Sequence, residues 1–151
     1  KEIVIPLNVK SLTIYGCNNQ YIIDNLHNNI EELKLCKTEL NLDNLPNSIK
    51  KIYINNYQKK LNNLPNSIEY LELHYYNFKI KKFPKNLKTI KCNKHYKYNN
   101  NFENYKVIYN DITYNSNLFL SSSYLQESLG LSGAKQYKKF SYANIIYKNI
   151  T

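Results

Sequence analysis

The side chains that most often bind metals or attack substrates are few in this chain, and they are widely spaced. Three His and three Cys occur: His27, His74, His95, Cys17, Cys36 and Cys92. No C-x-x-C pair is present, and the histidines have no partners at the spacing of a metal-binding motif. With three Gly there is also no phosphate-binding loop and no G-x-S-x-G motif. The sequence therefore predicts a protein that is not an enzyme and needs no metal, cofactor or small-molecule substrate.

Lysine is abundant, and its distribution is uneven. The net charge is +10; residues 1–78 are balanced, whereas residues 79–151 hold thirteen Lys against three acids. The densest stretch contains eight lysines and two tyrosines: Lys79, Lys81, Lys82, Lys85, Lys88, Lys91, Lys94, Lys97, Tyr96 and Tyr98. Ammonium groups beside aromatic rings are typical of surfaces that bind single-stranded nucleic acid or another polyanion, and they also suit an acidic protein partner. Because Lys, Asn, Ile and Tyr have AT-rich codons, a merely solvated surface from an AT-rich genome is a third interpretation.

A repeated segment must position these side chains. Copies begin at residues 5, 26, 45, 64 and 83, at spacings of 21, 19, 19 and 19, and a degenerate sixth copy begins near Phe102. Two copies start LPNSIKKIYI and LPNSIEYLEL, and all five contain the L-x-x-L-x-L frame of a leucine-rich repeat. The sequence predicts a leucine-rich-repeat solenoid of about five to six repeats, with short parallel strands, over residues 1–110.

Alternation with period two separates an inner from an outer face in each strand. We expect six strand residues to be buried: Leu33, Leu35, Ile52, Ile54, Leu71 and Leu73. Nineteen residues leave little room for a returning helix, so the convex segments are predicted to be extended or turn-like. Further inward anchors are Leu40, Leu42, Leu45, Phe78, Ile80 and Phe83, and most aromatic residues are interpreted as packing residues.

The outward strand positions form the predicted concave face, which we interpret as the partner-binding surface. Its candidate residues are Tyr15, Lys34, Lys51, Tyr53, Tyr70, Glu72 and His74. A column of charges runs beside them, with alternating sign: Lys10, Glu31, Lys50, Glu69 and Lys88. Adjacent strands lie about 4.8 Å apart. Opposite charges of neighbouring repeats are therefore expected to pair and to neutralise part of this face.

Residues 111–151 break the period. Ser121–Ser123 suit a helix N-cap before residues 124–129, and a second helix is predicted from about residue 134 to 147. On that second helix Tyr137, Phe140, Ala143 and Tyr147 would share one stripe. Because a solenoid end exposes apolar surface, we predict a helical C-terminal cap, with a docking helix for a partner as the alternative.

The LPNSI segments at residues 45–49 and 64–68, and GCNNQYIID at residues 16–24, resemble the FNIP-repeat family. These are leucine-rich-repeat proteins of social amoebae and mimivirus-like giant viruses. Asn19, Gln20 and Ile22 fit the family's turn, whereas Asn18 stands where the family has Phe. The resemblance covers about residues 5–106. Many family members carry an F-box ahead of the repeats, which implies a substrate-recognition role in ubiquitin ligation; this sequence shows no F-box.

The repeats and the missing catalytic motifs together favour a protein–protein interaction module, for which the resemblance implies a substrate-adaptor version. The alternative is nucleic-acid or other polyanion binding through the Lys-rich face of residues 79–106. No run of about 18 apolar residues occurs, so we expect no membrane association. Cysteines without a disulfide pattern favour a reducing compartment, either the cytoplasm or, for a viral protein, the host cytoplasm or virion.

Overall fold

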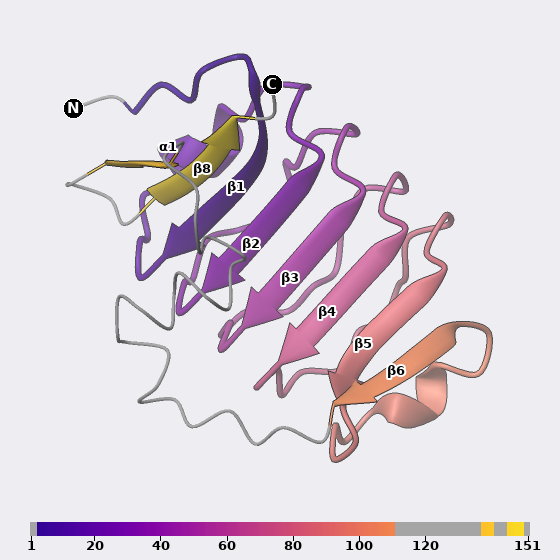
Figure 1. Cartoon of the computed structure of the whole chain (residues 1–151). Coiled ribbons are helices and arrows are strands. Elements are labelled where there is room, and N and C mark those ends of the chain that lie inside the picture. Colours follow the sequence, from indigo (N-terminus) through magenta and orange to yellow (C-terminus); the bar gives the residue numbers. More distant parts are fainter. Residues whose placement is uncertain (1–2, 111–136, 141–144, 150–151) are drawn as a thin grey trace.

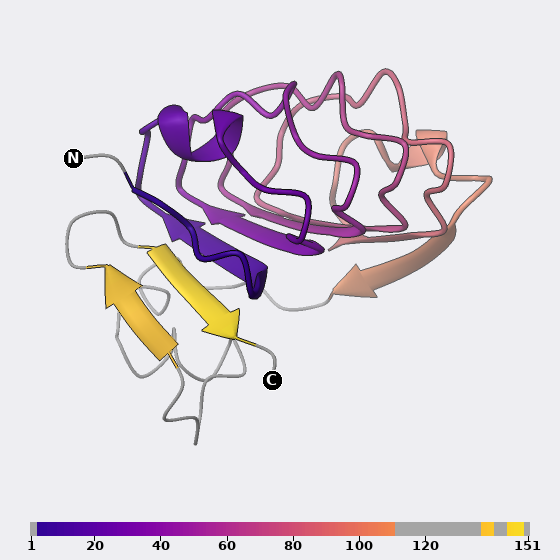
Figure 2. The ribbon, with the colours of Figure 1, turned by 90° about the horizontal axis from the view of Figure 1, so that it is seen from above.

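Six parallel strands, one for each repeat, form the body of the computed structural model, which describes residues 3–110, 137–140 and 145–149. They are β1 (Val9–Tyr15), β2 (Glu32–Cys36), β3 (Lys51–Asn55), β4 (Tyr70–His74), β5 (Thr89–Asn93) and β6 (Lys106–Asn110). The returning segments contain one short α-helix, α1 (Tyr21–Asp24), and one 3-10 helix, η1 (Asn99–Asn101). Strands and return segments lie in two layers (Figure 1, Figure 2). The predicted repeat solenoid is confirmed.

Equivalent residues of neighbouring repeats pair side by side. Leu33 aligns with Ile52, and Ile52 aligns with Leu71, so that each inward position forms a column across the sheet. The two inward columns are at most 2% exposed and consist of Leu12, Leu33, Ile52, Leu71 and Ile90, and of Ile14, Leu35, Ile54, Leu73 and Cys92. Each such aliphatic side chain stabilises the fold by about 1.5–3 kcal/mol relative to an exposed one. The six strand residues expected to be buried are buried.

The return segments close the other side of the core. Four of the predicted anchors are buried and Phe78 and Phe83 are partly buried; the buried ones are Leu40, Leu42, Leu45 and Ile80. A stack of tyrosines adds to them: Tyr76 lies between Tyr57 and Tyr96, with ring centroids 6.5 and 6.3 Å away. The Tyr57 hydroxyl donates to the Leu40 carbonyl at 2.6 Å, and the Tyr76 hydroxyl accepts from the Leu61 amide at 2.9 Å. Burial raises the pKa of Tyr76 to about 12, so its hydroxyl stays protonated.

The residue after each of the first four strands has a left-handed backbone. The φ angles are 55° at Gly16, 50° at Lys37, 49° at Asn56 and 48° at Tyr75. In this conformation the amides of Gly16, Lys37 and Asn56 donate to the last strand carbonyl of the next repeat, at 2.9–3.0 Å. The turn therefore extends the ladder between repeats by one hydrogen bond. Only Gly adopts this left-handed backbone conformation without a steric cost from Cβ.

We expect Lys37→Gly to raise the free energy of unfolding by about 0.5–1 kcal/mol, because it removes the Cβ clash of the left-handed turn. Gly16→Ala, at the equivalent position of the preceding repeat, should lower it by a similar or larger amount. Urea unfolding followed by circular dichroism measures both. Destabilisation by Lys37→Gly would show that the Lys37 side chain matters more than the backbone, for example through the ring of Tyr15, whose centroid lies 6.0 Å from Nζ.

The C-terminal segment pairs as strands where the structure describes it. β8 (Ile145–Asn149) runs antiparallel to β1, and β7 (Tyr137–Phe140) runs antiparallel to β8, giving the sheet order β6-β5-β4-β3-β2-β1-β8-β7. The second predicted helix, over residues 134–147, is therefore wrong at both strands. Strand pairing satisfies the free backbone edge of β1, and the segment is rich in Ile and Tyr, which favour strands. The first predicted helix, over residues 124–129, and the boundary at residue 111 lie outside the described residues.

Candidate interaction surfaces

The outward side chains of β1 to β5 form a surface that we call the strand face. It carries all seven residues predicted for partner binding: Tyr15, Lys34, Lys51, Tyr53, Tyr70, Glu72 and His74. The parallel register places Tyr53 beside Lys34 on one side and beside Glu72 on the other. The structure therefore brings the residues of β2, β3 and β4 into one cluster.

Glu72 lies at the centre of this cluster and is only 8% exposed. Its carboxylate accepts hydrogen bonds from the Tyr70 hydroxyl at 2.8 Å, contacts His74 Nε2 at 2.5 Å, and pairs with Lys91 Nζ of the next repeat at 3.1 Å. Burial alone would raise the pKa of this carboxyl, but the three polar partners outweigh it and lower the pKa to about 2. Glu72 is thus a charged group that fixes three neighbouring side chains in place.

Two tyrosine rings lie beside this carboxylate. The Tyr53 and Tyr70 ring centroids are 5.5 Å apart with planes tilted by 44°, and Lys34 Nζ lies 4.9 Å from the Tyr53 centroid. Lys34 also pairs with Glu32 at 3.2 Å on its own strand. Burial and the carboxylates of Glu32 and Glu72 raise the pKa of Tyr53 to about 12, so it presents a phenol and not a phenolate. The cluster offers ordered aromatic surface flanked by charges of both signs.

The predicted column of alternating charge pairs across neighbouring repeats. Glu31 contacts Lys10 at 3.3 Å and Lys50 at 4.0 Å, and Glu69 contacts Lys88 at 2.7 Å. Water screens these side chains because they are exposed or partly exposed, so the pairs contribute little stability. They do neutralise one margin of the strand face, as expected from the sequence.

The lysines predicted as one patch are divided between the two sides of the solenoid. Lys88 and Lys91 belong to the strand side, where each pairs with an acid of the preceding repeat.

Tyr96 is 7% exposed and stacks on Tyr76 and on Phe102, so it is a core residue and cannot stack on a ligand. This corrects the prediction that Tyr96 is part of a binding surface. Tyr98 is half-buried, with Lys97 Nζ 5.7 Å from its ring centroid, and Lys94 lies exposed in the turn after β5.

Four other lysines remain together on the return segment between β4 and β5, and we call them the return patch: Lys79, Lys81, Lys82 and Lys85. All four are exposed, and none forms an ion pair with another residue in the described part of the chain. The return patch is thus a group of four neighbouring lysines without an acidic partner in the described part of the chain.

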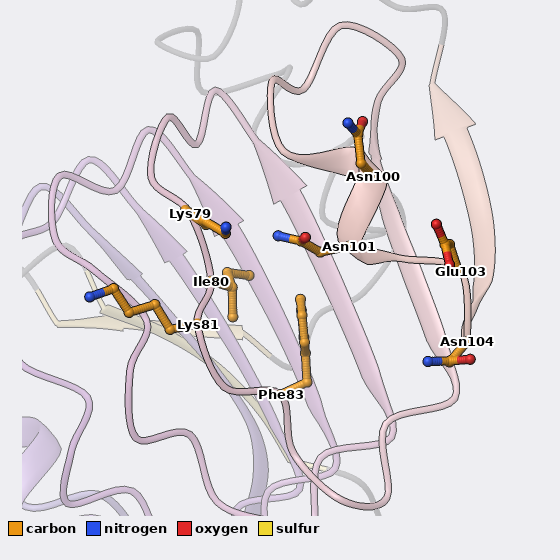
Figure 3. Close-up of a pocket in the computed structure, with 8 residues that line it drawn as sticks. All are labelled: Lys79, Ile80, Lys81, Phe83, Asn100, Asn101, Glu103 and Asn104. Atoms are coloured by element: carbon orange, nitrogen blue, oxygen red, sulfur yellow. The ribbon is translucent and has the colours of Figure 1, made fainter.

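An open pocket of about 630 Å³ adjoins the return patch (Figure 3). Its lining comes from the return segment after β4 and from η1 with the residues that follow it: Lys79, Ile80, Lys81, Phe83, Asn100, Asn101, Glu103 and Asn104. Ile80 is buried at its base, and the half-buried Phe83 ring is held by Phe102 and Tyr105, at centroid distances of 5.8 and 5.1 Å. The pocket combines an apolar floor with a polar rim.

Sequence reasoning missed the asparagines of this pocket, although a signal was present. Equivalent positions of β2 to β5 are 19 residues apart, whereas Thr89 of β5 pairs with Lys106 of β6, only 17 residues later. The shorter return segment contains η1 and cannot follow the path of the segment before it. The pocket opens between those two segments.

No group of three or more His, Cys, Asp or Glu side chains that could hold a metal ion occurs in the described residues. Burial raises the pKa of Cys36 to about 12 and that of Cys92 to about 11, so neither thiol is a ready nucleophile. Over the same part of the chain, no helix is long and apolar enough to cross a bilayer.

A known repeat family matches part of the chain. The family model described as the FNIP repeat matches residues 38–76, which include β3, β4 and the return segment between them. No curated protein and no solved structure matches the chain. The match confirms the resemblance found in the LPNSI segments and falls on the part of the strand face that holds Tyr53, Tyr70 and Glu72.

Proposed function

Since the chain carries FNIP repeats in a solenoid of parallel strands, we propose that it is a non-catalytic module that binds another protein through the strand face. The observation that carries this proposal is the cluster of Tyr53, Tyr70 and Lys34 around the buried carboxylate of Glu72. Tyrosines in rigid surroundings are among the residues that dominate binding energy at protein interfaces.

The order of the cluster supports the same proposal. Glu72 holds Tyr70 through its hydroxyl, and Tyr53 is held between the Tyr70 ring and Lys34. Side chains that are already fixed lose little conformational entropy when a partner binds, so more of the contact energy appears as affinity. Lys51, which is exposed on the same face, supplies a polar margin around the rings.

The test is quantitative capture of proteins from host-cell or infected-cell lysate on the immobilised chain after nuclease treatment. The double variant Tyr53→Ala/Lys34→Glu should reduce recovery of the specific partner, and its Kd should rise at least about tenfold, as for an interface hot spot. The matched control is Tyr21→Ala/Lys59→Glu, which changes the same residue types at exposed positions off the strand face. It should bind as the wild type does.

Equal loss of binding in both double variants would contradict a site on the strand face. Recovery of nucleic acid alone, with no protein that survives nuclease, would contradict the protein-binding function itself. The adaptor version of the proposal, in which the captured protein is a substrate for ubiquitin ligation, requires an F-box in the gene that encodes the repeats.

A second candidate function is polyanion binding through the return patch. The observation that favours it is that Lys79, Lys81, Lys82 and Lys85 gather on one segment without acidic partners among the described residues. Phosphate groups bind such exposed ammonium groups with release of counterions, so affinity falls steeply as salt rises. Because Lys88 and Lys91 are already paired, this surface is smaller than the predicted face of residues 79–106.

A further inference from the structure

The pocket beside the return patch presents polar groups that have no partners within the described residues. The side-chain amides of Asn100, Asn101 and Asn104 make no hydrogen bond there, and Lys79 and Lys81 make no ion pair. Each amide offers a donor and an acceptor, and each ammonium offers three donors. These five polar side chains and that of Glu103 line one hollow, and the three asparagine amides have hydrogen-bonding capacity that the described residues do not use.

Earlier repeats use the equivalent positions differently. Asp24 accepts a hydrogen bond from Asn44 at 3.4 Å, and Asp43 accepts one from Asn63 at 3.0 Å, so neighbouring return segments bind each other there. At successive steps of 19 residues, the column that begins Asp24 and Asp43 continues with Asn62, Lys81 and Asn100. The acids of the first repeats have become amides and a lysine in the last ones. The side-chain hydrogen bonds that join neighbouring return segments in the first repeats are therefore missing at the pocket.

The charged residues of the pocket lining are separated by sign. Figure 3 shows Lys79 and Lys81 on one side of the pocket and Glu103 on the other, with Ile80, Phe83 and Asn101 between them. An anionic group is attracted to the lysine side and repelled from the carboxylate side. A flat ring attached to that anion would then lie over the floor, beside the Phe83 ring and within reach of the asparagine amides.

We propose that this pocket binds one nucleotide, with its phosphate at Lys79 and Lys81 and its base beside Phe83 and Asn101. Ammonium groups bind phosphate, aromatic rings stack on bases, and Asn amides pair with base edges through two hydrogen bonds. The inference rests on the second candidate function, polyanion binding by the return patch, and locates its selective site. The same chemistry suits a free nucleotide and a nucleotide within a single strand.

The first experiment uses the side-chain amide signals of the ¹⁵N-labelled chain, titrated with AMP, adenosine, inorganic phosphate and glucuronate. AMP should shift the signals of Asn100, Asn101 and Asn104 and leave those of Asn47 and Asn62, exposed in other repeats, unchanged. Adenosine should produce weaker shifts because it lacks the phosphate. If AMP shifts none of these signals, or if glucuronate shifts them at lower concentration, the nucleotide assignment is overturned, in the latter case in favour of an anionic sugar.

The second experiment measures fluorescence anisotropy of a labelled single-stranded ten-nucleotide RNA at rising salt. Lys79→Glu/Lys81→Glu should weaken binding by about tenfold, as expected for two lost phosphate contacts. Lys59→Glu/Lys60→Glu, with the same change of charge in the preceding repeat, should weaken it much less. Asn101→Ala/Asn104→Ala should reduce affinity about fivefold without changing the salt slope, because these amides contact the base and not the phosphate.

The outcomes separate the pocket from the surface around it. If the lysine variant loses RNA while the asparagine variant binds normally and AMP shifts nothing, the return patch binds polyanions and the nucleotide pocket is refuted. If AMP shifts the three asparagines but no RNA binds, the pocket takes free nucleotides and the second candidate function fails. Equal weakening by both lysine variants would refute a localised site.

Discussion

Leu71→Asp is expected to unfold the solenoid. Leu71 is fully buried inside one of the two inward columns, paired with Ile52 and Ile90. A carboxylate there would lose its water without gaining a partner, which costs more than about 4 kcal/mol, close to the whole stability of a small domain. Far-ultraviolet circular dichroism at 25 °C should show an unfolded chain.

Two variants bracket this effect. Leu71→Ala should leave the chain folded but less stable by about 2–5 kcal/mol, because it opens a cavity without burying a charge. Asn62→Asp introduces the same charge at an exposed position of a return segment and should change stability little. A folded Leu71→Asp chain with strand-like dichroism would show that the inward columns are not the core.

Glu72→Gln is expected to have the second-largest effect. The pKa of Glu72 is lowered from 4.5 to about 2, so the ionised carboxylate stabilises the folded chain by about 3 kcal/mol at neutral pH. A lowered pKa contributes stability above the unfolded-state value and loses it as pH falls through the folded-state value. For Glu72 this contribution is complete above about pH 4.5 and disappears as the pH falls towards about 2.

Urea unfolding from pH 7 down to pH 2.5 measures this contribution. Wild type should lose more stability over the acid range than Glu72→Gln, and the gap between the two curves should narrow as the pH falls to 2.5. Glu69→Gln, which removes the partly exposed partner of Lys88, is the matched control. Lys88 also lowers the pKa of Glu69, but water screens that pair, so this variant should follow the wild-type curve more closely than Glu72→Gln does. Parallel curves for wild type and Glu72→Gln would mean that the carboxylate contributes no net stability.

The core could be predicted because it is local and periodic. Ile52, Ile54, Leu71 and Leu73 occupy the same frame in copies 19 residues apart, so one repeat defines the packing of the next. Tyr96 shows a limit of the same reasoning. The run of lysines around it suggested a surface, whereas its sequence distance from Tyr76, close to one repeat, and from Tyr57, close to two repeats, places it in the buried stack.

The strands of the C-terminal segment and the pocket could not be predicted, because both depend on contacts between segments that a local sequence pattern does not show. Tyr137, Phe140 and Tyr147 can share a helical stripe, but β8 pairs with β1, a strand more than a hundred residues away, and that free edge decides its conformation. The pocket arises because the step from β5 to β6 is two residues shorter than each step between β2 and β5. Its asparagines are uninformative by composition, since Asn is common throughout this sequence.

The pairing of β8 with β1 also determines when, during synthesis, both edges of β1 can be paired. Roughly 130 residues separate Tyr15 from Ile145, and at about 5–20 residues per second the ribosome needs on the order of ten seconds to add them. Repeats two to six can stack on β1 as they emerge, while its other edge waits for β8. During that interval the edge can accept a strand from a neighbouring nascent chain on the same messenger RNA. β8, which is made after the repeats, thus determines whether the second edge of β1 is paired within the same molecule.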